Sequence, residues 1–277
     1  MSKTTGVAEM KVYVVCDLEG VAGVVDFRKQ CMEDGAYYQQ AIRLATLELN
    51  ALVEGALEGG ATEVYAWPGH GDFPGGIDVE LIHPECRLVM HAGDGGPAGI
   101  DGSFDAMVLH GLHGMAGSEN GVLSHSFMPF LRNVWLNELK IGEIAMNMIS
   151  FGDHGVPTVM VTGDQAAVDE ARALVPGVEG AAVKWGLEEK HRLGALSVRR
   201  AVSLSPVKSR NLIRNAAKRA MGRIGAVEPF TMAPPYTMRV EYTEGKYAEA
   251  AAMNSGVQRI DENTVTQTRS RLQELVL

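Results

Sequence analysis

The sequence predicts an α/β fold in which a mostly parallel sheet is flanked by helices and a smaller α+β region follows at the C-terminus. Short apolar runs rich in β-branched residues alternate with helical stretches through most of the chain. These runs are almost continuously apolar, which is typical of parallel strands that are covered on both faces. With 277 residues, of which 46% are hydrophobic and 21% charged, the chain has enough apolar material for a large core.

The elements of the predicted sheet follow one another along the chain. Residues 11–16 (KVYVVC) are predicted to form a buried strand. Residues 37–60 are predicted to form a long helix, because apolar side chains recur there at helical spacing and two glycines end the pattern. A hairpin or bent strand is expected at 133–142. Further strands are expected at 62–67, 86–90, 104–111, 157–164 and 180–186, and further helices at 143–155 and 165–175.

The character of the sequence changes after about residue 187. A charged stretch leads into a basic amphipathic helix at 205–224, which begins with Ser-Pro, and a proline-containing linker then precedes a strand at 238–243. We therefore predict two units. Residues 1–187 form an α/β domain, and residues 188–277 form a smaller α+β region that packs on it and takes part in oligomer contacts.

Composition and charge narrow the possible partners. The net charge of −9 and the pI near 5.4 argue against nucleic acid, because binding phosphate requires clustered Lys and Arg. No segment approaches the ~18 consecutive apolar residues of a membrane span, and the first residues lack the apolar stretch of a signal peptide. Three irregularly spaced cysteines are typical of reduced thiols. We expect a cytoplasmic protein that binds neither nucleic acid nor membrane.

Two acidic residues directly after the first strand raise the question of what compensates their charge. Asp17 and Glu19 are two positions apart in VVCDLEGVAG, so on an extended chain they point the same way. Buried carboxylates so arranged repel each other unless a cation lies between them. A plain acidic loop would show the same spacing, so the D-x-E pattern alone is not specific for a metal.

Further residues that can bind metal follow other predicted strands, and ligands gather at the carboxyl ends of strands in open α/β sheets. His70 follows the second strand, His113 follows the strand at 104–111, and Glu143 opens the next helix. Carboxylates and imidazoles are zinc ligands, and a carboxylate can bridge two metals. Alternatives exist for two of them: His110 lies three residues before His113, and Glu138 lies on the expected hairpin.

The ordered motifs resemble the M55 family of peptidases, the D-aminopeptidases. The family's first-strand D-x-E-G motif is similar to VVCDLEGVAG, and its later motifs are similar to GHGD (69–72), GLHG (111–114), GVLSHS (121–126) and IGEIAMN (141–147), in the same order and at nearly the same spacing. The resemblance covers residues 11 to about 186 well and the remainder loosely.

The resemblance implies a peptidase with two zinc ions per subunit. Asp17 would bridge both ions, Glu19 and His70 would complete one zinc, and His113 and Glu143 would complete the other. It also implies that His125 is the catalytic histidine, as nucleophile or base, and that the subunits form a ring-shaped decamer. Asn147, one helical turn after Glu143, is expected to orient a ligand or to contact substrate.

One departure from the family pattern concerns the surroundings of His70. The family usually has an N-D-S-H-like segment there, whereas this chain has WPGH at 67–70. The Asp and Ser that could orient the histidine by hydrogen bonding to its ring are missing. The ligand itself is retained, so the change bears on the substrate more than on the metal.

We therefore predict a zinc-dependent hydrolase that cleaves the amide bond of short peptides or amino-acid amides, with preference for a D-residue at the N-terminus. An M55-type amidase that acts on a non-peptide amide or lactam is the nearest alternative. A dinuclear phosphoesterase would require a phosphate-binding nest or Arg cluster, and none is evident in the sequence. An oligomeric metal-binding protein without catalysis is the alternative from another class, against which His125 argues.

Overall fold

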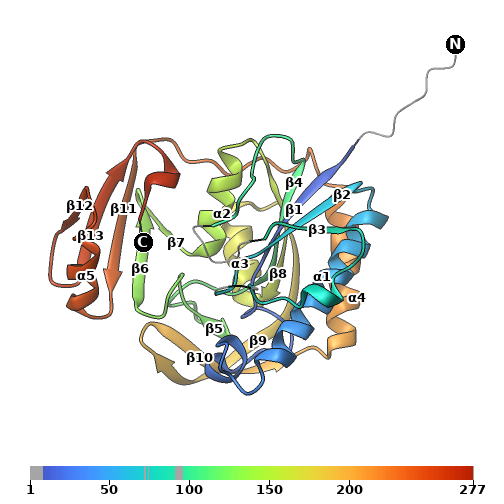
Figure 1. Cartoon of the computed structure of the whole chain (residues 1–277), viewed down its shortest axis with the longest axis horizontal. Helices are drawn as coiled ribbons and strands as arrows, with labels where there is room; N and C mark the ends of the chain where they lie inside the picture. Colours follow the sequence, from blue (N-terminus) through green and yellow to red (C-terminus); the bar gives the residue numbers. More distant parts are fainter. Residues whose placement is uncertain (1–8, 72, 74, 91–95, 277) are drawn as a thin grey trace, which may run out of the picture.

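The computed structural model describes residues 9–71, 73, 75–90 and 96–276, and it confirms the α/β fold. An eight-stranded sheet has the order β3-β2-β1-β4-β8-β9-β10-β5, and a five-stranded sheet has the order β12-β13-β11-β6-β7 (Figure 1). The large sheet consists of β1 (Lys11–Cys16), β2 (Glu63–Pro68), β3 (Cys86–Leu88), β4 (Ala106–Leu112), β5 (Leu123–Ser124), β8 (Thr158–Asp164), β9 (Glu179–Leu193) and β10 (Leu196–Ser203). The small sheet consists of β6 (Leu131–Leu136), β7 (Leu139–Ile141), β11 (Tyr236–Tyr242), β12 (Val257–Arg259) and β13 (Thr264–Arg269).

Strands β3, β2, β1, β4, β8 and β9 pair in parallel, and β10 and β5 add an antiparallel edge. β4 and β8 are buried along their whole length, as expected of central strands between two helical layers. The helices are α1 (Tyr38–Glu58), α2 (Glu143–Gly152), α3 (Gln165–Leu174), α4 (Pro206–Met221) and α5 (Gly245–Ala251), with short helical turns at Phe27–Cys31, Val79–Leu81 and Leu272–Glu274. None of the helices in the described part of the chain combines the length and the apolar character needed to span a bilayer.

Helices α1 and α4 lie together on one side of the large sheet, whereas α2 and α3 lie on the other (Figure 1). A glycine allows α1 and α4 to approach closely, because a Cβ atom at Gly55 would lie 2.1 Å from the carbonyl oxygen of Arg214. Basic residues in the second half of α4 form ion pairs with acidic residues of α1 and β9, such as Arg214 with Glu58 and Arg219 with Glu179. Part of the positive charge of α4 is therefore neutralised by acidic residues of the same chain.

Helix α2 joins the two sheets. Its Ile144 and Met148 belong to the core of the large sheet, whereas Ala145 and Ile149 belong to the core beneath the small sheet. Apolar residues on two sides of one helix fix its position and its rotation. Glu143, at the first turn of this helix, is thereby held at the junction of the two sheets.

The predicted boundary after residue 187 lies inside β9, and the small sheet takes β6 and β7 from the sequence before it. The charged stretch that suggested the boundary forms the exposed part of the long β9–β10 hairpin, because residues 187–192 face solvent there. β10, β12, β13 and α5 lie in the part of the chain for which the sequence pattern predicted little structure.

A buried carboxyl group on α1 predicts a pH effect on stability. Glu48 is 2% exposed, and its Oε1 accepts a hydrogen bond from the Ala22 backbone N–H at 3.3 Å. Burial raises the pKa of Glu48 from 4.5 to about 7. An acid with a raised pKa contributes stability below pH 4.5 that is lost as the pH rises through 7, and at about 1.4 kcal/mol per pH unit the loss is about 3 kcal/mol.

We therefore expect Glu48→Gln to unfold with a smaller dependence on pH than the wild type. Urea unfolding at pH 5 and pH 8 measures the difference, and Glu249→Gln, at an exposed position of α5, is the control. The wild type should lose about 2.5 kcal/mol relative to Glu48→Gln between the two pH values. Parallel pH curves for wild type and Glu48→Gln would contradict the assignment.

Candidate metal centre

Asp17 and Glu19 lie at the carboxyl end of β1, where the chain continues its pairing with the end of β4. The backbone N–H of Asp17 donates to His110 O at 2.8 Å, and that of Gly20 donates to Gly111 O at 2.7 Å. The Leu18 side chain between the two acids is fully buried. A Cβ atom at position 20 would lie 1.9 Å from the carbonyl oxygen of Leu112, so this close approach requires the glycine that follows the D-x-E pattern.

His113 directly follows β4 and faces two of the acids. Its Nδ1 lies 3.1 Å from the Gly114 carbonyl oxygen, to which it can donate, so that Nε2 carries the lone pair. Nε2 lies 3.3 Å from Asp17 Oδ2 and 3.6 Å from Glu143 Oε1. Glu143 is itself oriented by the backbone N–H of Phe127, which donates to its Oε1 at 2.6 Å.

His70 faces the other oxygen of Asp17. Its Nδ1 lies 3.3 Å from Asp17 Oδ1 and 2.9 Å from Glu19 Oε2. Its Nε2 lies 2.8 Å from the carbonyl oxygen of Cys31, at the end of the π-helical turn Phe27–Cys31. A backbone carbonyl therefore orients this imidazole, in place of the side chains that the family motif would supply. Every residue has a backbone carbonyl, so the residue type at position 31 gave no sign that Cys31 would contact His70.

The electrostatics of these side chains indicate that the acids require positive charge. Burial would raise the pKa of Asp17, but the facing imidazoles of His113 and His70 outweigh it and hold that pKa well below its usual value. Burial would lower the pKa of His70, but Glu19 and Asp17 raise it well above its usual value. In the same way, burial of His113 is outweighed by Glu143 and Asp17, which raise its pKa.

The five predicted ligands form one connected cluster, and their donor atoms suit zinc. Asp17 Oδ2, Glu19 Oε2 and His113 Nε2 are buried, and their imidazole–carboxylate contacts at 2.9 and 3.3 Å lack hydrogen-bond geometry, so these atoms make no hydrogen bond among the described residues. Buried polar atoms without partners are costly unless something else coordinates them. Carboxylate oxygens and imidazole nitrogens within a few ångströms of one another are a typical zinc ligand set. In particular, ligand atoms of Asp17, Glu19 and His113 all lie within 4.8 Å of one another.

His125 lies against this cluster, just after β5. Its ring stacks on that of His113, with centroids 4.1 Å apart and an interplanar angle of 9°, and Phe27 contacts it edge-on. Its Nδ1 lies 2.9 Å from the carbonyl oxygen of Leu123, to which it can donate. Burial lowers the pKa of His125, so the ring is neutral at pH 7 with a lone pair on Nε2. Its ligand atoms also lie within 4.8 Å of those of His113 and Glu143.

The two alternative residues lie outside the cluster. His110 is fully buried within β4, its Nε2 lies 3.2 Å from the carbonyl oxygen of Ala45, and burial lowers its pKa to about 4. It is therefore a neutral core histidine. Glu138 is exposed in the turn between β6 and β7.

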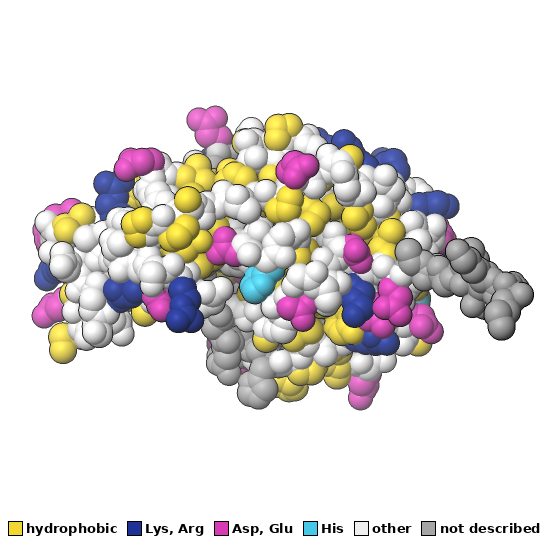
Figure 2. Space-filling model, turned by 90° about the horizontal axis from the view of Figure 1, so that it is seen from above, with side chains coloured by type: hydrophobic (Ala, Val, Ile, Leu, Met, Phe, Trp, Pro, Cys, Tyr) yellow, Lys and Arg dark blue, Asp and Glu magenta, His cyan; other side chains and the backbone are white. Residues whose placement is uncertain are grey.

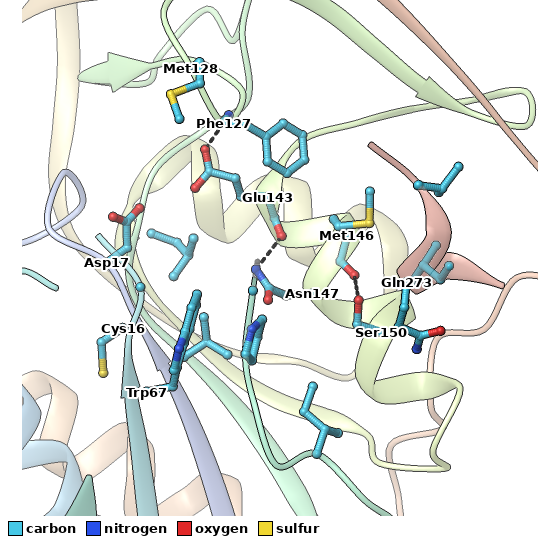
Figure 3. A pocket seen from close by; sticks show the side chains of 18 of the residues that line it. Cys16, Asp17, Trp67, Phe127, Met128, Glu143, Met146, Asn147, Ser150 and Gln273 are labelled. Carbon is cyan, nitrogen blue, oxygen red and sulfur yellow. Dashed lines mark hydrogen bonds between the residues drawn. The ribbon is translucent and has the colours of Figure 1, made fainter. Parts of the chain in front are cut away.

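A cavity of about 720 Å³ opens beside the cluster. Asp17 and Glu143 line one end of it (Figure 3). From there one wall follows α2 through Met146, Asn147 and Ser150, and Trp67 stands on the side of β2 (Figure 3). The cavity is of the size that proteins use for small organic ligands.

Comparison with known proteins agrees with these observations. The family model of the peptidase M55 family, described as D-aminopeptidase, matches residues 10–277. A D-aminopeptidase of Bacillus subtilis (strain 168) is 30% identical over 268 residues, which cover 95% of this chain and 92% of the relative. The solved structure of the Zn-dependent D-aminopeptidase DppA from Bacillus subtilis, described as a self-compartmentalizing protease, is similar with a TM-score of 0.86 and 28% identity, covering 96% of this chain and 93% of DppA. The resemblance noted in the sequence is thus confirmed, and the chain belongs to the peptidase M55 family of D-aminopeptidases.

Proposed function

We propose that this protein is a zinc-dependent aminopeptidase that removes the first residue of short peptides or amino-acid amides, with preference for D-residues. The observation that carries the proposal is the position of the Asp17 carboxylate, whose two oxygens face two different histidines. Oδ1 faces His70 and Oδ2 faces His113, each at 3.3 Å. A carboxylate placed in this way suits a bridge between two metal ions. The names of the similar proteins, D-aminopeptidase and Zn-dependent D-aminopeptidase, support the activity.

Each zinc would be held by residues on one side of Asp17. Glu19 and His70 would hold one ion, and His113 and Glu143 the other. Two zinc ions at this position would supply Lewis-acid polarisation of the scissile carbonyl and positive charge for the oxyanion that develops.

His125 performs the proton chemistry in this proposal. Its Nδ1–H is directed to the Leu123 carbonyl, which leaves Nε2 as the basic nitrogen. Stacking on His113 places it beside the proposed ligands, and burial lowers its pKa and keeps it neutral at pH 7. A neutral imidazole in this position can take the proton of an attacking water and later return it to the leaving amine. If the imidazole attacks the carbonyl itself, water must protonate the leaving amine and then hydrolyse the acyl-imidazole.

The activity is tested with zinc-loaded protein and the p-nitroanilides of D-alanine and L-alanine. We expect hydrolysis that a chelator abolishes and zinc restores, with the D-substrate cleaved faster. Zinc content is measured on the same preparations. If protein that holds zinc cleaves neither anilide nor any short D-peptide, the proposed function is wrong.

The proposed ligand roles predict the number of zinc ions that a variant holds. Glu143→Gln keeps the acceptor for the Phe127 N–H but loses the charged ligand oxygen. We expect wild type to bind two zinc ions per chain and Glu143→Gln to bind about one, because Asp17, Glu19 and His70 remain. Metal analysis after gel filtration measures this, with Glu138→Gln in the β6–β7 turn as the control that keeps two. Two firmly held ions in Glu143→Gln would contradict the assignment.

We also propose that the protein is a cytoplasmic homo-oligomer, and specifically a ring-shaped decamer. The description of DppA as self-compartmentalizing supports an assembly of several copies. Hydrophobic side chains gather across the middle of the face in Figure 2, whereas Lys and Arg lie mostly toward its two ends. Such areas are typical of subunit contacts. The cysteines, all three of them free, suit a reducing compartment. Light scattering should give a mass of about 300 kDa, ten times 29.8 kDa.

A further inference from the structure

Resting on the proposed function, we propose that the preferred substrates carry a bulky, uncharged, apolar group on the leaving side of the scissile amide. A free carboxylate at that position is disfavoured. The substrate class is therefore amino-acid amides, arylamides and peptides with a neutral C-terminal end, rather than dipeptides with a free C-terminus. Three features of the cavity support this inference.

The first feature is the direction in which the cavity leads away from the proposed metals. An aminopeptidase holds the amino end and the scissile carbonyl of its substrate at the reacting centre, so the part that extends farthest is the leaving side. The α2 wall runs from Glu143 to Ser150, and the seven steps between these residues span about 10 Å at 1.5 Å per residue. Leu272 and Leu275 also line the cavity, and Gln273 lies past Ser150 in Figure 3. The cavity is thus longer than the second residue of an alanine dipeptide.

The second feature is the composition of the walls. Apolar side chains predominate, among them Trp67, Phe127 and Phe130, and no described residue that lines the cavity is Lys or Arg. His154 also lines the cavity, at an exposed position. A carboxylate brought into such a space would lose its hydration without gaining an ammonium or guanidinium partner, which is costly. An uncharged apolar group would gain from the same burial.

The third feature is that polar side chains of α2 donate hydrogen bonds to backbone carbonyls of the same helix. Asn147 Nδ2 donates to the Glu143 carbonyl oxygen at 2.8 Å, and Ser150 Oγ donates to the Met146 carbonyl oxygen at 2.9 Å (Figure 3). The Ser150 hydroxyl and one of the two N–H groups of Asn147 are therefore directed to their own helix. The second N–H of Asn147 and its Oδ1 remain able to bond a substrate amide, but neither carries a charge that could balance a carboxylate. The indole N–H of Trp67, buried without a partner among the described residues, is neutral and cannot balance a negative charge.

Four matched substrates separate the effect of charge from the effect of size. D-Ala-D-Ala, D-Ala-D-Ala amide, D-Ala-D-Phe and D-Ala-D-Phe amide are compared at pH 8, above the ordinary pKa of histidine. We expect kcat/KM to rise at least about 10-fold from each free acid to its amide, and about 10-fold from Ala to Phe. Faster cleavage of the free acids would overturn the inference while leaving the aminopeptidase proposal intact. Failure to cleave any of the four, by protein that holds zinc, would instead overturn the proposed function.

A cation introduced into the cavity tests the same inference from the side of the protein. Ser150 lines the cavity on α2. Substitution with Lys or with Met introduces a side chain of similar length at this position, but only Lys adds a positive charge. We expect Ser150→Lys to reduce the preference for amide over free acid at least about 10-fold, because the ammonium would pair with the substrate carboxylate. Ser150→Met should retain the wild-type preference. If a folded Ser150→Lys protein keeps the wild-type ratio of kcat/KM for amide over free acid, the inference is contradicted. If that variant does not fold, the four kcat/KM values of the wild type decide the question.

Discussion

Substituting His125 with alanine is expected to lower kcat/KM about 1,000-fold while the protein keeps its zinc. Proton transfer by a positioned side chain contributes between about 100-fold and 10,000-fold to enzymatic rates. His125 meets the structural requirements for that role, because Leu123 fixes its Nδ1 and burial lowers its pKa so that the ring is neutral. Its contact with the proposed metal ligands is a ring stack on His113, which alanine removes without removing a ligand charge.

Zinc content decides between two roles for this histidine. The ring nitrogens of His125 also lie near those of His113 and the carboxylate of Glu143, so His125 could bind the metal instead. If His125→Ala loses activity and keeps two zinc ions per chain, the side chain acts on the substrate. If the zinc content falls to about one, His125 is a ligand and the assignment as catalytic residue is wrong. His191→Ala, at an exposed position of β9, is the control and should retain wild-type activity.

The central part of the fold could be predicted from the sequence because its physical signals are local. A strand buried on both faces must be apolar almost throughout, and β1, β4 and β8 satisfy that requirement. The candidate ligands could be found for a related reason. Polar side chains directly after such strands lie at one edge of the sheet, so the sequence alone predicts that Asp17, Glu19 and His113 lie near one another.

What could not be predicted depends on pairing between distant segments. The five-stranded sheet joins β6 and β7 to β11, which lies about a hundred residues later, and nothing local in residues 131–141 indicates that partner. Two strands of this sheet were not predicted from the sequence, because β12 is short and mostly exposed and β13 is rich in threonine, so that both resemble polar loops. The same limit applies at the site, where the carbonyl of Cys31 orients His70 from a segment 39 residues away.

A second group that sequence reasoning missed is Lys184, and its removal is expected to have the largest effect on stability. The residue is fully buried on β9, and its ammonium donates hydrogen bonds to the backbone carbonyls of Glu19 and Val24. It therefore holds the loop that begins with the proposed metal ligands. Burial lowers the pKa of Lys184, whereas nearby groups, among them the carboxylates of Asp164, Glu19 and Glu48, act in the opposite direction.

Lys184→Met retains the length of the side chain and removes its charge and hydrogen bonds. Two buried carbonyls then lose their donor and nearby carboxylates lose a compensating cation, so we expect the free energy of unfolding of the metal-free protein to fall by about 3–5 kcal/mol. Zinc should also bind more weakly, because the Glu19 backbone carbonyl loses its hydrogen bond from Lys184 and the Glu19 side chain is then less well positioned. Urea unfolding in chelator measures the first effect, and competition with a chromogenic chelator measures the second.

Lys190→Met separates this role from a general effect of losing a lysine. Lys190 is exposed on the same strand, so its substitution should change the free energy of unfolding by less than about 0.5 kcal/mol and leave zinc affinity unaltered. Wild-type stability and wild-type zinc affinity in Lys184→Met would show that the loop is held by other contacts. Lower stability with unchanged zinc affinity would assign Lys184 to the core alone. A loss of both stability and zinc affinity is the result expected if the Lys184 ammonium, on β9, holds the loop that carries Asp17 and Glu19 after β1.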